Sequence, residues 1–568
     1  DDDYIPTPPD GGYGWIIVIC SFVSNMIVDG IGYTFGVFLV EFVDVFKAPK
    51  SKISLIGSLL CGIYLFAGPI VSGMTNRYGC KPVAVVGSFI SATAFVLSTF
   101  SPNVEVLTLT YGVIGGFGFG MIYLPAIVSV GYYFESKRAL ATGIAVCGSG
   151  VGTFVLAPFS KFLLDQYDWR NALLILAGII LQAAVCGMLM RPLEVSKPKP
   201  TRPRAKNMID RIKEQTKSKP SSPQHELPPI DSKDTNKRKS DPEVQYPVVK
   251  TTKFSNGSLP NNMHHKIHEF SPLLSASDPK NIMLKVQPNG LQNIVVNDKR
   301  SKLINSKNLL APKEDYKRPL YRKDIFYSGS VLNIPQFKSQ PDMRSYIQSI
   351  TTIPTEIERK EESHFWQYLC IPNSAKDTLR EMMDFSLFRD AGFILLCTGN
   401  VFVFLGFYVP FVYLVDKAVL NGIDEHKAAF LVSVIGITNC FGRLVAGWLA
   451  DRPRVSSLLV NNISVAITGL ITMLFPFCND YITLNVAASI FGTSLGAFIS
   501  LSSIIICDLL GIEKLTNAFG LLAMFRGMAA MAGPPLAGYI YDTTSSYDIS
   551  FYTGGALCSI GAILHFLL

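Results

Sequence analysis

Residues 428–450 read AAFLVSVIGITNCFGRLVAGWLA and contain a single charge, at Arg443. A transmembrane helix needs about 20 predominantly apolar residues, so this run is long enough to cross a bilayer. A guanidinium at that depth costs at least about 2.5 kcal/mol on insertion scales. Snorkelling is the simple explanation, but Asp451 at the end of the run lies eight residues away, about 12 Å along a helix. An arginine stem covers only part of that distance, so we expect Arg443 to face a cavity and meet an anion.

Similar apolar runs occur along most of the chain, separated by short turns. They are too long for buried strands, and the Gly and Pro residues inside them are tolerated in membrane helices. Six precede a long polar insert and six follow it, at residues 14–40, 55–75, 82–100, 107–133, 139–163, 171–190, 390–415, 428–450, 455–477, 482–509, 516–540 and 551–568. The sequence therefore predicts an all-α integral membrane protein with twelve transmembrane helices.

The two membrane halves repeat each other in their loops. The related stretches are RYGCK (77–81) with GWLADR (447–452), and ESKRALATG (135–143) with GIEKLTNAFG (511–520). Each pair follows corresponding spans of the two halves, the second with the eighth and the fourth with the tenth. Repeats of this kind place a substrate site near the bilayer midplane, between two bundles. We therefore expect two six-helix bundles, at residues 14–190 and 390–568.

Charge is distributed very unevenly along the chain. Residues 191–389 hold 35 of the 51 Lys and Arg and 22 of the 43 Asp and Glu, a net charge of +13, and the remaining residues have a net charge of −5. The total of +8 therefore comes from one polar insert between two membrane-type halves. A basic total of this origin does not indicate nucleic-acid binding.

The insert changes character near its end. Residues 191–363 are rich in Pro, Ser, Lys and Asn and poor in aromatic side chains. Such a segment cannot bury enough apolar surface to offset its conformational entropy, so we expect a mostly disordered basic loop. Residues 364–389 contain aromatic and aliphatic side chains that predict a short amphipathic juxtamembrane helix on the inner leaflet of the lipid bilayer.

A basic cluster directly after the sixth span sets the orientation, because the short loops alone do not decide it. The cluster consists of Arg191, Lys197, Lys199, Arg202, Arg204 and Lys206. These residues lie within the counting range of the positive-inside rule. We therefore expect the insert, the segment 1–13 and the carboxyl end all to be cytoplasmic. The chain starts with Asp1 and ends in an apolar run, so we also expect it to be incomplete.

Four charged residues lie well inside the predicted spans: Asp29, Arg443, Asp508 and Arg526. Two acids and two bases suggest internal pairing as one explanation. A carrier can use the same residues for a ligand, because arginine binds a carboxylate in bidentate fashion and aspartate accepts a proton or an ammonium group. Asp508 lies late in its span, where a salt bridge at the inner rim is an equally good explanation. The sequence does not decide which acid meets which base.

The sequence contains no constellation typical of an enzyme. It has no HExxH, no GxSxG and no phosphate-binding loop, and its eleven cysteines include no CxxC pair. These are the patterns that would indicate a metalloprotease, a serine hydrolase, a nucleotide site or a zinc site. We therefore expect no enzyme activity, no cofactor and no metal.

Three stretches resemble the signatures of a known family. They are DGGYGW (10–15) at the first span, YFESKRALATG (133–143) before the fifth and GPPLAG (533–538) in the eleventh. They are similar to the diagnostic stretches of the monocarboxylate transporter family, solute carrier family 16. That family belongs to the major facilitator superfamily. The resemblance therefore implies two six-helix bundles, alternating access and a multi-pass protein of the plasma membrane.

Two positions differ from the proton-coupled lactate carriers of that family. Those carriers have an aspartate four residues before the arginine of the eighth span, whereas Asn439 occupies that position before Arg443. Their first-span lysine falls at or near Tyr33. The resemblance thus implies a substrate site with Arg443, Asn439 and Tyr33. It favours the less characterised branches of the family over proton–lactate symport.

The resulting hypothesis is a carrier for a small organic anion, either a monocarboxylate or a zwitterionic carboxylate, with proton linkage left open. Arg443 would hold the carboxylate, Arg526 would supply a second positive charge, and Asp29 or Asp508 would take a proton or an ammonium group. Some family members need a single-span immunoglobulin-type partner to reach the cell surface, and this sequence neither requires nor excludes one. The alternative is a non-transporting, carrier-like sensor with a cytoplasmic signalling loop.

Overall fold

The computed structural model describes residues 8–193, 318–331, 334–340, 343–351, 372–450, 452 and 455–568. The predictions for residues 1–7, for most of 191–363 and for 364–371 concern residues outside these ranges. Within the described ranges the regular structure is helical, and one isolated antiparallel bridge joins Arg322 to Thr351. The predicted all-α membrane fold is confirmed.

The amino-terminal bundle contains the first six spans. Its helices are α1 (Gly14–Tyr33), α2 (Phe35–Phe46), α3 (Lys50–Phe66), α4 (Gly68–Tyr78), α5 (Cys80–Ser98), α6 (Val104–Leu107), the π-helix η2 (Thr108–Ile114), α7 (Gly115–Tyr133), α8 (Arg138–Gln166) and α9 (Trp169–Leu189). Helices α3 and α4 meet at 50°. Pro69 in the first turn of α4 explains this bend, because proline lacks the backbone N–H that would continue α3.

The carboxyl-terminal bundle contains the other six spans. Its helices are α15 (Ala391–Phe407), α16 (Val409–Leu420), α17 (Glu425–Ala450), α18 (Ser457–Leu474), η9 (Phe475–Phe477), α19 (Tyr481–Leu510), η10 (Ile512–Lys514), α20 (Leu515–Thr544) and α21 (Tyr547–Phe566). In the described residues eleven helical segments are long and apolar enough to cross a membrane, and the bent α3–α4 pair makes a twelfth when it is counted as one span. This agrees with the predicted six-plus-six arrangement.

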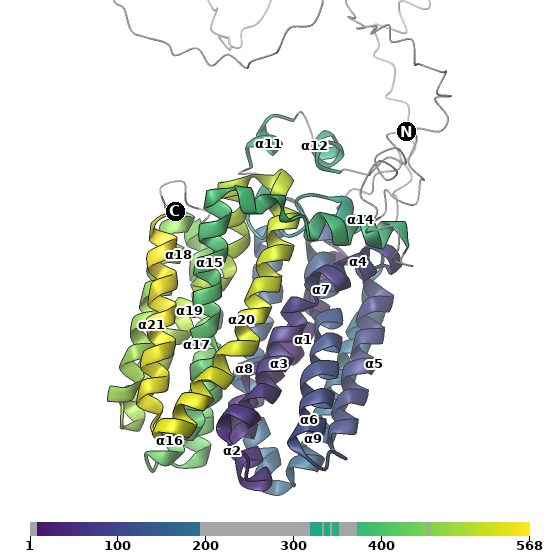
Figure 1. Ribbon diagram of the computed structural model, residues 1–568. Helices are drawn as coiled ribbons and strands as arrows, with labels where there is room; N and C mark the ends of the chain where they lie inside the picture. Colours follow the sequence, from purple (N-terminus) through teal and green to yellow (C-terminus); the bar gives the residue numbers. More distant parts are fainter. Residues whose placement is uncertain are drawn as a thin grey trace, which may run out of the picture. The chain divides into compact units, whose positions relative to one another are not determined.

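The shorter helices lie at one end of the bundles. They are η5 (Pro319–Tyr321), α11 (Pro335–Lys338), α12 (Met343–Ile350), α14 (Asn373–Met382) and η8 (Phe385–Arg389). Figure 1 shows α11, α12 and α14 at this end, which we call the insert side, and α2 and α16 at the other end. The residues just before α1 also lie here, because the Tyr13 hydroxyl donates to the Leu189 carbonyl at the end of α9, at 2.7 Å.

Helix α14 rests on both bundles. Its buried Ser374 and Thr378 contact α4, where the Asn76 amide donates to the Thr378 hydroxyl at 2.7 Å. Its buried Met382 contacts Gly520 of α20. The sequence predicted a helix here that lies on the lipid, and the structure shows that the buried face of α14 packs on protein.

The bundles contact each other through α8 with α17 and through α3 with α20. Glycines make the first of these contacts possible, since a Cβ on Gly150 would lie 2.5 Å from the Gly436 carbonyl oxygen. On the opposite face of α8, a Cβ on Gly152 would lie 2.1 Å from the Met26 carbonyl oxygen of α1. Small residues let membrane helices approach at backbone distance. Helix α8 is therefore held against one helix of each bundle.

The close packing of α8 on α1 predicts that Gly152→Ala destabilises the protein. The added methyl group meets backbone, which cannot move aside, and overpacking of this kind costs about 1–3 kcal/mol. The purified variant should therefore melt at a lower temperature than the unchanged protein. Gly178→Ala on α9 is the matched control, because a Cβ at Gly178 meets nothing within 4 Å. Equal melting temperatures for the two variants would contradict the α1–α8 contact.

Candidate functional site

Asp29 is the buried acid of the amino-terminal bundle. It lies on α1 and is 3% exposed. Its carboxylate accepts hydrogen bonds from the Ser149 hydroxyl of α8 and, at 3.3 Å, from the Tyr64 hydroxyl of α3. Three helices therefore hold one carboxylate through neutral donors. The charge of Arg443 also acts on Asp29, although the two residues come from different bundles.

Arg443 lies on α17 and is 5% exposed. Its Nε donates to Oδ1 of Asn439, one turn earlier on the same helix, at 2.8 Å. Its Nη1 donates across the bundle boundary to the Val146 carbonyl of α8 at 3.4 Å. Among the described residues, every hydrogen-bond acceptor of this guanidinium is neutral. Asn439 thus orients Arg443 without neutralising its charge.

Arg526 lies on α20 and is half-buried within the carboxyl-terminal bundle. Its Nε and Nη2 both donate to Oδ1 of Asn400 on α15, at 2.9 and 2.6 Å, and Nη2 also donates to the Ser502 hydroxyl of α19 at 2.5 Å. The guanidinium lies 5.1 Å from the ring centre of Phe404. A neutral amide, a hydroxyl and an aromatic face therefore receive this second cation.

Asp29, Arg443 and Arg526, which we call the central charge group, lie on the spans α1, α17 and α20. Tyr64, which donates to Asp29, packs on Tyr123 of α7 with ring centres 5.4 Å apart. Tyr33, one turn after Asp29 on α1, stacks on Phe411 of α16 with ring centres 4.7 Å apart. Arg443 and Tyr33 thus reach across the bundle boundary, and Asn439 orients Arg443 there. The hydrogen bonds of Asp29 and Arg526 stay within their own bundles.

Asp508 lies apart from the central charge group. It is exposed in the last turn of α19, on the insert side. Sequence reasoning also missed several polar partners. Ser149, Tyr64 and Ser502 are ordinary helix residues in the sequence, and only their contacts with Asp29 and Arg526 single them out.

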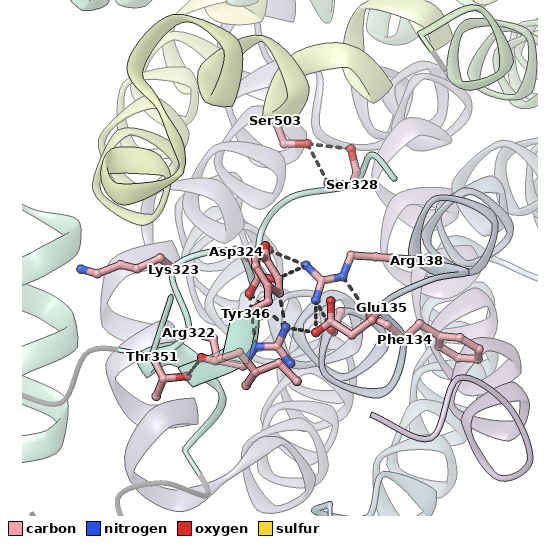
Figure 2. Close-up of polar contacts among 12 residues, drawn as sticks. Phe134, Glu135, Arg138, Arg322, Lys323, Asp324, Ser328, Tyr346, Thr351 and Ser503 are labelled. Atoms are coloured by element: carbon pink, nitrogen blue, oxygen red, sulfur yellow. Dashed lines mark hydrogen bonds and ion pairs between the residues drawn. The ribbon is translucent and has the colours of Figure 1, made fainter. Parts of the chain in front are cut away.

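A second set of charges lies on the insert side, where Figure 2 shows Arg138, Glu135, Arg322 and Asp324 in contact. Arg138 begins α8, and Glu135 lies in the turn before it. Arg322 and Asp324 belong to residues 318–331 of the insert, which we call the strap. Exposure of these four side chains is between 0 and 4%. Two cations and two anions thus form a buried cluster with no net charge, which we call the strap anchor.

Arg138 is the centre of the strap anchor. Its Nη1 donates to Oδ2 and to the carbonyl oxygen of Asp324, at 2.9 and 2.8 Å. Its Nη2 donates to Oε1 of Glu135 at 3.1 Å, and Arg322 donates to the same carboxylate and to Asp324. Hydrogen bonds to buried charged groups are stronger than those between neutral groups. The strap is therefore held to α8 by fully desolvated ion pairs.

The two carboxyl groups of the anchor respond differently to this environment. Burial raises the pKa of Glu135 despite the two nearby arginines. Burial also opposes ionisation of Asp324, but Arg138 and Arg322 outweigh it and hold its pKa below the usual range. The ionised form of Asp324 therefore stabilises the fold above the ordinary carboxyl pKa. This contribution is lost as the pH falls through the lowered value.

Sequence comparison agrees with this architecture. A profile of the Major Facilitator Superfamily matches residues 15–269 and 394–568. The chain belongs to the major facilitator superfamily. Similar members are Monocarboxylate transporter 14 of Homo sapiens, 29% identical over 557 residues (98% of this chain, 90% of the relative), Monocarboxylate transporter 9 of Gallus gallus, 29% over 562 residues (98% and 93%), and Monocarboxylate transporter 2 of Mesocricetus auratus, 27% over 570 residues (99% and 85%).

These comparisons confirm the family resemblance read from the sequence. This superfamily member is a multi-pass membrane transporter rather than an enzyme. The relatives are named as transporters, and the match covers most of their length. The relatives include members 14 and 9 as well as member 2, so the match is not confined to one branch.

The strap anchor predicts that Asp324→Ala destabilises this superfamily member. The change leaves Arg138 and Arg322 with one buried acid between them, and breaking a buried ion pair costs about 3–5 kcal/mol. The melting temperature of the purified protein should fall, and proteases should cut the strap more readily. Asp508→Ala removes an exposed carboxylate and should change stability by no more than about 0.5 kcal/mol. Similar losses for both variants would argue against the anchor.

Proposed function

We propose that this transporter moves a small organic anion, a monocarboxylate or a zwitterionic carboxylate, by alternating access between its two bundles. The observation that carries the proposal is the charge balance of the central charge group. The group contains two arginines and one acid, Asp29, and among the described residues both guanidinium groups rest on neutral acceptors. A buried cation without an ionic partner is costly in a membrane. A substrate carboxylate supplies the missing negative charge.

Arg443 is the proposed carboxylate clamp. Its guanidinium lies at the bundle boundary, with Nε fixed by Asn439 and Nη1 on the carbonyl of Val146. A planar guanidinium binds a carboxylate through two parallel hydrogen bonds, which fixes orientation as well as charge. The 3.4 Å contact to Val146 is the longer of the two contacts, so it is the one that a substrate would replace. Arg526 adds a second positive charge from α20.

Asp29 is the proposed site for a proton or for the ammonium group of a zwitterion. Its oxygens accept from Ser149 and Tyr64, two hydroxyls that tolerate either protonation state of the carboxyl group. The ring of Tyr64, which donates to Asp29, lies beside that of Tyr123 with ring centres 5.4 Å apart. Aromatic faces attract an ammonium group. Asp508, which is exposed on α19, has no part in this proposal.

We propose a plasma-membrane location with the insert side in the cytoplasm. The basic cluster that follows α9 supports this orientation under the positive-inside rule. The chain start and the end of α9 share the insert side, so the amino terminus would also be cytoplasmic. A single-span immunoglobulin-type partner stays a prediction of the family resemblance. The sensor alternative loses support because the similar proteins are named as transporters.

Arg443→Ala should abolish saturable uptake, because it removes the proposed carboxylate clamp. The measurement is uptake of a panel of labelled monocarboxylates and zwitterionic carboxylates by cells that express equal surface amounts of each protein. Arg443→Lys keeps the charge but loses the bidentate geometry, so it should retain part of the uptake. Arg170→Ala changes an exposed arginine at the start of α9 and is the matched control. Unchanged uptake by Arg443→Ala would refute the assignment.

Asp29→Asn tests proton linkage separately from substrate binding. If Asp29 carries a coupled proton, substrate entry acidifies the cell, and the amide variant should exchange labelled substrate without acidification. If Asp29 instead meets an ammonium group, the variant should lose zwitterions and keep simple monocarboxylates. A pH-sensitive dye and the same uptake panel distinguish the two outcomes, with Asp508→Asn as the control. If Asp29→Asn behaves like the unchanged protein in both assays, Asp29 does not belong to the substrate site.

A further inference from the structure

The strap contacts both bundles on the insert side. Its amino-terminal part touches α4, where the Arg318 guanidinium donates to the Asn76 carbonyl at 3.1 Å. Its middle belongs to the strap anchor on α8. Its carboxyl-terminal part reaches α19, where the hydroxyls of Ser328 and Ser503 lie 2.6 Å apart. Figure 2 shows Asp324 of the strap beside Arg138, and Ser328 of the strap beside Ser503. One short segment therefore joins the two halves of the transporter.

The contact with the amino-terminal bundle is ionic and dry. Glu135, Arg138 and Asp324 are fully buried, and Arg322 is 3% exposed. The strap backbone also lies directly on α7, since a Cβ on Gly131 would lie 2.7 Å from the Ile325 carbonyl oxygen. Separating such charges means moving each of them into water or leaving one unpaired in the protein, and either change is unfavourable without a replacement partner.

The contact with the carboxyl-terminal bundle is neutral throughout the described residues. It includes hydrogen bonds of Ser328 with the Ser503 hydroxyl and the Ser500 carbonyl, a stack of Phe326 on Phe519 of α20 with ring centres 4.6 Å apart, and a long hydrogen bond of 3.4 Å from the Thr516 hydroxyl to the Lys323 carbonyl. The charged side chain of Lys323 pairs with Glu381 of α14, which rests on both bundles. Water can replace each of these hydroxyl partners, because none carries a charge. The strap is thus anchored on one bundle and rests on the other.

We propose that the strap is the inner gate of the transporter: it stays bound to Glu135 and Arg138 and releases Ser503 and Phe519 when the pathway opens to the insert side. This inference rests on the proposed alternating access. For the bundles to separate on the insert side, every segment that joins them there must release one of its two contacts. The neutral contact is the one that breaks with less loss, because separating the buried ion pairs would leave charges unpaired or move them into water.

The opposite side has a closure of a different kind. There Lys50 at the start of α3 pairs with Asp416 of α16, and the hydroxyl of Tyr547 donates to the same carboxylate. The ammonium of Lys50 also lies 4.0 Å from the ring centre of Tyr541. Side chains of the spans themselves therefore close that end, whereas a separate segment of the insert closes the other. Under this proposal, the strap and residues 135–138 of the family signature both take part in transport.

A disulfide between strap and α19 tests the gate. In Ser328→Cys/Ser503→Cys the sulfur atoms take the places of hydroxyl oxygens that are in contact, so a mild oxidant should join them. Mass spectrometry of the digested protein gives the cross-linked fraction. Uptake of the substrate found for the unchanged protein should fall in proportion to that fraction, and a reductant should restore it. Neither serine belongs to the central charge group, so the reduced double variant should transport.

The controls separate the gate from the proposed transport. The unchanged protein and each single cysteine variant, treated with the same oxidant, should keep their uptake despite the native cysteines. Cross-linked protein that transports at the reduced rate would overturn the gate and leave the proposed transport standing. Failure of the two cysteines to join would also overturn it, because the contact itself would be absent. Absence of any uptake by the unchanged protein would overturn the proposed transport and the gate with it.

Discussion

A charge that leaves water inside a membrane protein must meet another charge or a set of strong hydrogen-bond partners, and this constraint governs the structure described here. The protein satisfies it in two ways. At the strap anchor, two arginines meet two acids and the balance is complete. At the central charge group, two arginines and one acid each rest on neutral hydrogen-bond partners. The first arrangement suits a permanent contact, and the second suits a site that receives an anion.

The fold was predictable because the signals that encode it are long and local. Each span is a continuous apolar run, so its existence follows from the hydrocarbon thickness and the need to satisfy every backbone group within the helix. The breaks inside spans were less accessible. The first predicted span ends at residue 40, whereas α2 continues to Phe46, and the 50° bend at Pro69 is invisible to hydropathy. Pro69 lies at a break between two helices, whereas Pro125 and Pro158 lie inside continuous ones, so a proline in the sequence does not by itself predict a break.

The central charges could be named from the sequence for the same reason, since Asp29, Arg443 and Arg526 stand out in apolar runs. Their partners could not, because Ser149, Tyr64 and Ser502 come from other helices and have no unusual local pattern. The strap was the larger omission. Composition predicts disorder for 191–363 as a whole, and an average over that length hides the aromatic and charged residues of 318–331. A buried ion pair is a property of two distant segments, which no single segment reveals.

The long sequence separation within the strap anchor has a consequence for biosynthesis. Arg138 and Asp324 are 186 residues apart, and ribosomes add about 5–20 residues per second, so the first member waits roughly 10–40 s for the second. During that interval α8 is already made while Glu135 and Arg138 remain hydrated at the membrane surface. The first bundle must therefore insert and hold its shape without the strap. The strap also precedes the second bundle, which begins with α15 at Ala391, so it can dock on the first bundle before the second one is made.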